Sequence, residues 1–157
     1  MKYTLIITNL ALGLSAIFYT SCGGNTANTD AATPPPKSMI SEEKAPADPM
    51  ENKGIGPVSS VELAELDQAL ADEGKLLFEN KCSACHKVGK RFVGPDPTGI
   101  MERRSPEWVM NMILNPEQMV KEDPIAKELL KEYLSPMANQ SLTEQEARSI
   151  LEYFRTI

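Results

Sequence analysis

The chain has 157 residues, a formal net charge of −6 and an aromatic content of 6%. This length allows one folded domain with appended segments, and the acidic balance argues against general nucleic-acid binding, which needs a basic surface. The single histidine and the three cysteines narrow the kinds of metal or cofactor site that the chain can build.

The first residues have the pattern of a secretory signal peptide. Lys2 precedes an apolar run from Leu5 to Tyr19, and small residues then lead to Cys22. A basic start, a short apolar stretch and small residues before a cleavage site are typical of such signals. An uncleaved membrane anchor is the alternative, but the run is short for a spanning helix of about 20 residues. In either case the remainder of the chain is expected outside the cytoplasm.

The residues around Cys22 resemble a bacterial lipobox, although Tyr19 replaces the usual aliphatic residue. The resemblance implies a signal peptide over residues 1–21, cleavage before Cys22 and diacylation of its thiol. The expected protein is a lipoprotein, anchored to a membrane by its lipid on the periplasmic side.

Residues 22–60 are expected to form a flexible tether that starts at the lipidated cysteine. Small and polar residues surround six prolines in this segment: Pro34, Pro35, Pro36, Pro46, Pro49 and Pro57. Such a composition buries too little apolar surface to fold by itself. A tether would hold the following domain near the membrane and raise its effective concentration towards partners there; a plain spacer is the alternative.

The folded domain is expected over residues 61–157, with a first helix from Leu63 to Lys81 and Gly74 inside it. A glycine within a helix costs about 1 kcal/mol relative to alanine, so it usually has a packing reason. The reason expected here is the close approach of an aromatic side chain from the last helix.

The segment Cys82-Ser83-Ala84-Cys85-His86 has the spacing of a c-type haem attachment site. Each thiol adds to one vinyl group of the haem, and the histidine that follows reaches the iron from the proximal side. A four-ligand zinc site would need more cysteines or histidines, and a thioredoxin-like pair would need a βαβ setting. Because His86 is the only histidine, the sequence predicts one covalent haem c and no second histidine ligand. With Cys22 lipidated, no cysteine remains for a structural disulfide.

Cap residues predict where the later helices start. Ser105-Pro106 and Asp123-Pro124 each place a capping side chain before a proline, and Asn115-Pro116 ends one helix and starts another turn. Thr143 to Glu146 form a capping box. Apolar residues follow the box at helical spacing, at Ala147, Ile150, Leu151 and Phe154.

Gly74 and Phe78 ahead of the haem motif, with Tyr153 in the capped last helix, resemble a class I monohaem c-type cytochrome. Together with the lipobox, the resemblance is to a bacterial lipoprotein cytochrome c. It covers residues 61–157. It implies an all-α fold of about four to five helices around one covalently bound haem, in which the first and last helices cross.

The same resemblance implies roles for several residues around the haem. Gly94-Pro95 is similar to the family's Gly-Pro loop, so the Pro95 carbonyl is expected to accept a hydrogen bond from His86 Nδ1–H. Trp108 is expected to donate its indole N–H to a haem propionate, with plain core packing as the alternative. Arg103 and Arg104 can pair with a propionate, but solvent exposure is the expectation for both.

The sixth iron ligand is expected to be a methionine. Five methionines follow the haem motif: Met101, Met110, Met112, Met119 and Met137. Most are expected to fill the core, since methionine suits irregular packing. Met137 lies in the loop before the last helix, where class I cytochromes place this ligand, and Met119 is the second candidate. His86 and Met137 are therefore the predicted metal ligands.

The function expected from the resemblance is one-electron transfer in a bacterial respiratory chain, and not an enzyme activity. The alternatives are a gas-binding haem sensor or small haem enzyme with an open sixth position, and a fixed haem subunit of a respiratory complex. The stretches around Met137 and Trp108 look similar to lipoprotein cytochromes of anaerobic respiration. They imply a quinol-oxidising membrane complex as donor, and a terminal oxidase or a reductase, such as nitrous oxide reductase, as acceptor.

Charge is unevenly distributed around the haem motif. Residues 81–104 contain six basic and two acidic residues, a net charge of +4, whereas residues 62–79 have a net charge of −5. This asymmetry predicts that an acidic partner docks on a basic haem rim and that charge steers the encounter. Scattered, solvated charges are the alternative.

Overall fold

The computed structural model describes residues 48–157 of the chain. These residues form five α-helices and a short 3-10 helix: α1 (Gln68–Lys81), η1 (Ile100–Glu102), α2 (Pro106–Leu114), α3 (Pro116–Glu122), α4 (Pro124–Tyr133) and α5 (Glu144–Phe154). No strand occurs between residues 48 and 157, so the predicted all-α fold is confirmed. Within that range, every helix is too short or too polar to cross a bilayer.

The helix starts follow local capping chemistry. The predicted caps Ser105, Asp123 and Thr143 each accept a backbone N–H of the first turn, and the capping box at Thr143 is complete. The first helix, however, begins at Gln68 rather than Leu63, because the Asp67 side chain accepts the N–H groups of the next turn from an extended backbone.

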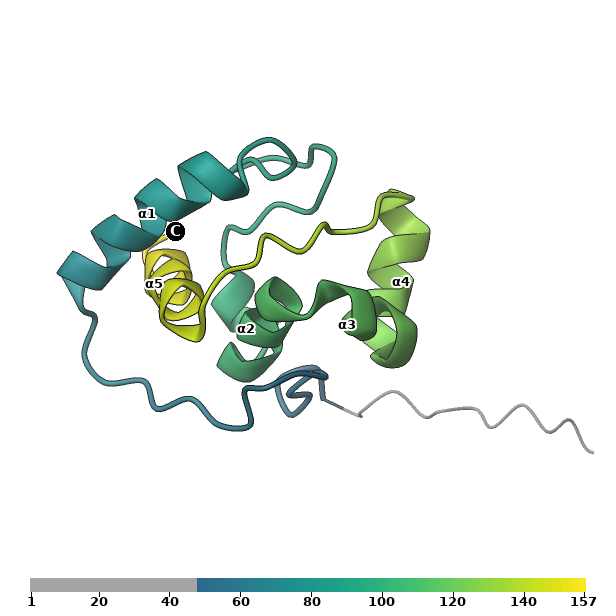
Figure 1. The fold of residues 1–157 in the computed structure, drawn as a ribbon, viewed down its shortest axis with the longest axis horizontal. Coiled ribbons are helices and arrows are strands. Elements are labelled where there is room, and N and C mark those ends of the chain that lie inside the picture. The colour runs from purple at the N-terminus through teal and green to yellow at the C-terminus, as the bar shows by residue number, and fades with distance from the viewer. Residues whose placement is uncertain (1–47) are drawn as a thin grey trace, which may run out of the picture. The chain divides into compact units, whose positions relative to one another are not determined.

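Helices α1 and α5 cross (Figure 1), and Gly74 lies at their closest approach. A Cβ atom on Gly74 would lie 1.8 Å from the Ser149 carbonyl oxygen and 2.8 Å from the Ile150 amide nitrogen. The expected reason for this glycine was therefore wrong: it admits the backbone of the last helix, not an aromatic side chain. The aromatic contact lies one turn further along, where the Phe78 ring packs 5.6 Å from Tyr153 and 5.8 Å from Phe154, between ring centroids.

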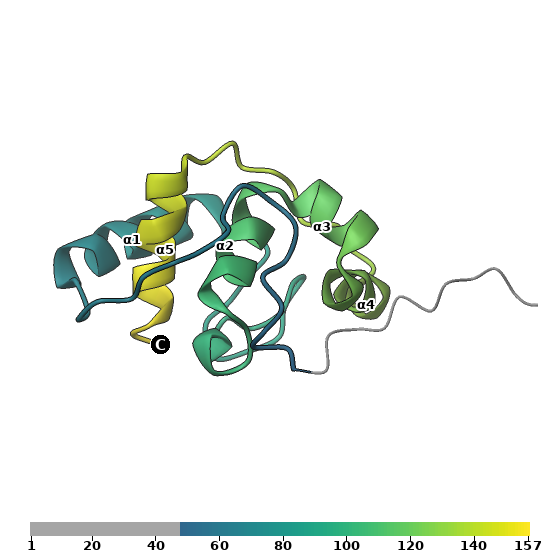
Figure 2. The same ribbon diagram turned by 90° about the horizontal axis from the view of Figure 1, so that it is seen from below.

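Residues 52–64, here called the strap, run along the domain ahead of α1 and cross α5 and α2 (Figure 2). The buried Asn111 side chain in α2 donates to the carbonyls of Lys53 and Val58 and accepts the N–H of Val58. Val58 itself is only 4% exposed. The predicted flexible tether is therefore wrong for residues 52–60, because a distant asparagine satisfies their backbone groups.

The far end of the strap is held by α5. Glu152 is buried and forms ion pairs with Arg148 on the same helix and with Arg155, which caps the C-terminal end of α5. These two arginines then donate to strap carbonyls, Arg148 to that of Glu62 and Arg155 to that of Ala64. The folded domain thus starts before residue 61. The predicted signal peptide, Cys22 and the tether up to residue 47 lie outside the described residues.

Candidate haem site

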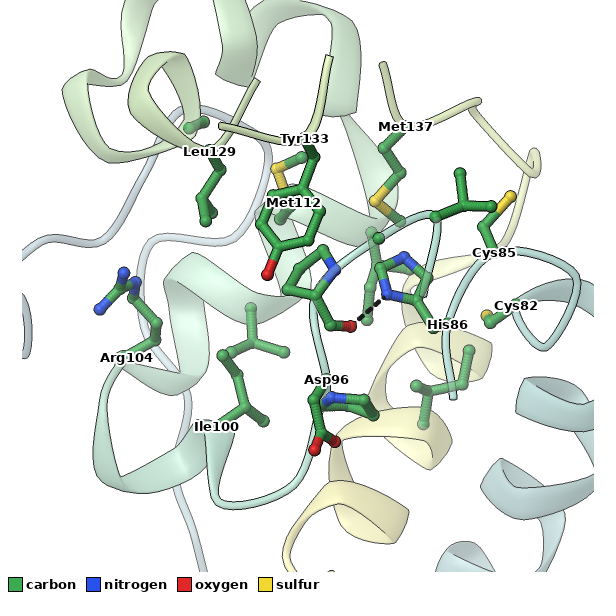
Figure 3. Close-up of a pocket in the computed structure, with 18 of the residues that line it drawn as sticks. Cys82, Cys85, His86, Asp96, Ile100, Arg104, Met112, Leu129, Tyr133 and Met137 are labelled. Atoms are coloured by element: carbon green, nitrogen blue, oxygen red, sulfur yellow. Dashed lines mark hydrogen bonds between the residues drawn. The ribbon is translucent and has the colours of Figure 1, made fainter. Parts of the chain in front are cut away.

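A cavity of about 530 Å³ opens between α2, α4 and the loops that flank them, a size typical of ligand sites. The haem motif forms one wall, and core side chains form another (Figure 3). All the residues that the sequence predicted to hold the haem line this cavity: Cys82, Cys85, His86, Pro95, Trp108 and Met137.

The haem motif folds into a turn at the end of α1. The backbone N–H groups of Cys85 and His86 both donate to the Cys82 carbonyl, at 3.0 and 2.9 Å. This turn places both thiols and the imidazole on the cavity wall. Burial and the neighbouring Cys85 raise the pKa of the Cys82 thiol to about 11. In this structure the thiols stand in for the thioether sulfurs of the haem-loaded protein.

His86 is oriented by the loop that follows it. Its Nδ1 lies 2.8 Å from the Pro95 carbonyl oxygen, the hydrogen bond that the family resemblance implied. A carbonyl only accepts, so Nδ1 carries a proton, and in the neutral ring this leaves the lone pair on Nε2. Gly94 makes this possible, because a Cβ there would lie 2.6 Å from the imidazole Cε1. An imidazole held in this way suits a metal ligand.

The candidate methionine ligands differ in whether they reach the cavity. Met137 projects into the cavity from the loop before α5, and Met112 reaches it from α2 (Figure 3). Met119, the second candidate from the sequence, is fully buried, and its sulfur accepts the N–H of Ile55 at 2.9 Å. It does not line the cavity, whereas Met137 does.

Trp108 has a different hydrogen-bond partner from the propionate that the resemblance implied. Its indole N–H donates to Oδ1 of the buried Asp123 at 3.1 Å. The indole has a single N–H, so in this structure it is not available to a haem carboxylate. Sequence reasoning identified Asp123 only as a helix cap, and nothing local to that residue indicated its contact with Trp108.

The basic residues of the haem region are partly engaged within the chain. Arg91 pairs with Glu132, and its guanidinium lies 4.0 Å from the centroid of the Tyr133 ring. Arg103 donates to the carbonyls of Thr98 and Asp96. The guanidinium charges in this region are therefore less available to a partner than the sequence count suggests.

The residues present fit a haem and do not fit a bare metal ion. No group of three or more histidine, cysteine or acidic side chains that could hold a metal exists among residues 48–157. His86 therefore needs the ligands of a macrocycle to hold iron. Six buried hydrophobic residues also line the cavity, so a bound haem would complete the core: Phe78, Trp108, Val109, Ile113, Ala126 and Ile150.

Comparisons with known proteins agree with this geometry. The family model described as Cytochrome c matches residues 71–157. The solved structure of cytochrome c from Rhodothermus marinus is 44% identical, with 64% of this chain and 88% of that chain covered and a TM-score of 0.63. An engineered form of it, Rma TDE, is 43% identical, with 64% and 89% covered and a TM-score of 0.63.

The engineered Rma TDE protein bound to a carbene intermediate is also similar. It is 44% identical, with 64% of this chain and 88% of that chain covered and a TM-score of 0.60. No curated protein matches significantly.

Proposed function

Because this chain belongs to the cytochrome c family, whose members carry covalent haem c and transfer electrons, we propose that it is a membrane-tethered one-electron carrier of a bacterial respiratory chain. In this proposal His86 and Met137 would bind the haem iron. The observation that carries it is the convergence of Cys82, Cys85, His86 and Met137 on one cavity, with His86 Nδ1 bonded to Pro95. When bound, the haem supplies an iron centre that alternates between Fe(III) and Fe(II).

The chain's own residues hold and tune that centre. Cys82 and Cys85 attach the haem, and the Pro95 carbonyl fixes the His86 tautomer and raises the basicity of the ring. Met137 as sixth ligand would raise the reduction potential and leave no open position for substrate.

The covalent attachment is tested by removing both thiols. In the Cys82→Ala, Cys85→Ala variant we expect no haem to stay with the denatured protein, and little folded protein, since the haem completes the core. The wild-type haem should resist extraction into acid–acetone, and haem that extracts from the wild type contradicts the attachment. Variants with a single cysteine replaced should each keep one thioether bond to the haem. Their yield of folded, haem-loaded protein should lie between those of the wild type and the double variant.

Membrane anchoring is proposed from the lipobox resemblance at Cys22 and the proline-rich residues after it. A Cys22→Ser variant should appear in the soluble fraction or keep its signal peptide, because serine offers no thiol for diacylation. Mass spectrometry of the mature wild-type protein should find the lipid on Cys22. An unmodified Cys22 in that protein rules out the lipid anchor.

The proposed partners are a quinol-oxidising complex as donor and a terminal oxidase or reductase, such as nitrous oxide reductase, as acceptor. Since Arg91 and Arg103 have partners within the chain, the basic rim relies most on Lys87 and Lys90. The Nζ atom of Lys87 lies 5.5 Å from the centroid of the Phe92 ring, and Phe92 is an exposed apolar side chain. Such a surface suits a partner with an acidic rim.

We expect the Lys87→Glu, Lys90→Glu variant to slow electron transfer to the partner by at least about tenfold at low salt. Near physiological salt the Debye length is about 8 Å, so the difference should shrink as salt rises. Stopped-flow kinetics at increasing ionic strength measures this, with haem content as the control. A wild-type rate that is flat or rises with salt contradicts basic-rim docking.

The alternative is a sensor or enzyme with an open iron position. Cytochromes c are generally electron carriers, and the engineered R. marinus protein is described as bound to a carbene intermediate. For this chain such chemistry requires that Met137 does not bind the iron. The location of Met137 in the cavity favours the electron carrier. A Met137→Ala variant distinguishes the carrier from the sensor or enzyme.

A further inference from the structure

Arg91 links the loop behind the haem motif to the end of α4. It lies between His86 and Pro95 in the chain, and its guanidinium forms an ion pair with the Glu132 side chain. A second nitrogen, Nη2, donates to the Glu132 carbonyl at 3.2 Å, and the guanidinium carbon lies 4.0 Å from the centroid of the Tyr133 ring. Arg91, Glu132 and Tyr133 are here called the clamp.

The Arg91 end of the clamp is attached to His86. The Gly94 N–H donates to the Cys85 carbonyl at 2.8 Å, and the Pro95 carbonyl lies 2.8 Å from His86 Nδ1. The loop that carries Arg91 therefore folds back onto the haem motif, and its position is tied to that of the imidazole.

The other end of the clamp holds a helix with few buried contacts. Among residues 124–133, Ala126 alone is buried, and three apolar or aromatic residues of α4 line the cavity: Leu129, Leu130 and Tyr133. The Glu132 carbonyl belongs to the last turn of α4, where no later helical N–H can reach it. Arg91 gives this carbonyl a donor and places a cation at the negative end of the helix dipole.

The segment that carries Met137 has few hydrogen bonds of its own. Residues 135–142 form no backbone–backbone hydrogen bond with any part of the chain that the structure describes. Their side-chain bond to another helix is long, from Asn139 Nδ2 to the Leu114 carbonyl at 3.4 Å. The position of Met137 therefore depends on where the two ends of this segment are held.

The two ends are held differently. The C-terminal end enters the capping box of α5, in which Thr143 and Glu146 bond reciprocally. The N-terminal end leaves α4 through Leu134, whose φ of 53° is unfavourable for a residue with a Cβ and whose side chain is 85% exposed. Leu134 does not favour this turn by itself, so the clamp at Glu132 and Tyr133 holds this end.

We propose that Arg91 is a positioning residue for the sixth iron ligand: by clamping the end of α4 to the loop behind His86, it fixes the point from which Met137 enters the cavity (Figure 3). This inference rests on the proposed ligation by His86 and Met137, and it names what maintains that ligation. Without the clamp, both thioether bonds remain, but Met137 is off the iron in a larger fraction of molecules.

The test is the binding of imidazole to the oxidised, haem-loaded full-length protein. Imidazole reaches the iron only where Met137 has left it, so its apparent affinity rises in proportion to the fraction of open molecules. An exposed ion pair and a cation–π contact each contribute modestly, so Arg91→Gln should bind imidazole about five- to tenfold more tightly than the wild type. The weak far-red absorbance band that reports a Met–Fe(III) bond should remain, because most molecules stay closed.

Further clamp variants sharpen the test. Glu132→Gln should raise the affinity less than Arg91→Gln does, and the double variant should match Arg91→Gln, because both replacements remove one contact. Arg91→Lys keeps the charge without the planar fork and should lie between Arg91→Gln and the wild type. Since the Glu132 side chain is half-exposed, Glu132→Gln also serves if Arg91→Gln fails to fold.

Two controls separate the clamp from charge and from general stability. Glu128→Gln is the same replacement one turn earlier on α4, where Glu128 pairs with Lys131 of the same helix at 2.6 Å. It should bind imidazole as the wild type does. Asp67→Ala removes the N-cap of α1 and should lower the unfolding midpoint without changing the imidazole affinity.

An imidazole affinity for Arg91→Gln no higher than that of Glu128→Gln overturns the proposal, and so does an equal rise in Asp67→Ala. In both cases a Met–Fe(III) band in the wild type leaves the proposed function intact. A wild type without that band contradicts the proposed ligation itself, and the clamp then has no ligand to position.

Discussion

Replacing Gly74 by alanine is expected to destabilise the domain by about 3 kcal/mol or more, because the added Cβ has no room. It would lie 1.8 Å from the Ser149 carbonyl oxygen and 2.3 Å from the carbonyl carbon. These are backbone atoms inside α5, so no side chain can rotate away, and the two helices must separate. Overpacking of this kind costs about 1–3 kcal/mol, and more where nothing can shift.

Denaturant unfolding of the haem-loaded protein measures this loss, and the lower midpoint should come with reduced haem yield. The Phe78 contacts with Tyr153 and Phe154 lie near the same crossing, so near-ultraviolet circular dichroism should change as well. A Gly74→Ala protein with wild-type stability would mean that α1 and α5 do not cross as closely as described.

Gly89→Ala is the matched control. Gly89 has a φ of +80° and no atom within 4 Å of its would-be Cβ. Alanine there has the backbone cost of a left-handed conformation, roughly 1–2 kcal/mol, without a clash. A clearly larger loss for Gly74→Ala than for Gly89→Ala would show that the clash at the helix crossing, and not the replacement of a glycine as such, destabilises the domain.

Replacing Met137 by alanine is expected to abolish the weak far-red absorbance band of the oxidised protein that reports a Met–Fe(III) bond. The reduced variant should then bind carbon monoxide, whereas the wild type, with Met137 on the iron, is expected not to bind it. The midpoint potential should fall, because a methionine ligand raises it. Absorbance spectroscopy with and without carbon monoxide measures the first two effects, and a redox titration measures the third.

Two other methionines serve as controls. Met112→Leu changes a cavity-lining thioether on α2 and should keep the band, while Met119→Leu should weaken stability and keep the band, since the Met119 sulfur faces Ile55. Loss of the band in either control, with Met137→Ala unchanged, would reject the ligand assignment. A wild type that lacks the band and binds carbon monoxide favours the sensor or enzyme instead.

The sequence by itself was sufficient for most features whose chemistry is local, and the cap of α1 at Asp67 is the exception. The haem motif occupies five consecutive residues, and the caps at Ser105, Asp123 and Thr143 act within one helical turn. Spacing therefore predicted the haem motif and three of the helix starts, whereas the all-α fold was implied by the resemblance to class I cytochromes c. The bond between His86 and Pro95 joins residues only nine positions apart, and the resemblance to a known loop was enough to imply it.

Only the tertiary structure decided which of several chemically equivalent partners each long-range group meets. Asn111 orders the strap from 53 residues away, which no composition rule for the proline-rich segment can include. Asp123, rather than a haem carboxylate, takes the Trp108 N–H, and the backbone of Ser149 occupies the space at Gly74. A donor, an acceptor or a missing Cβ specifies what kind of neighbour it needs, but the packing of the helices determines which residue supplies it.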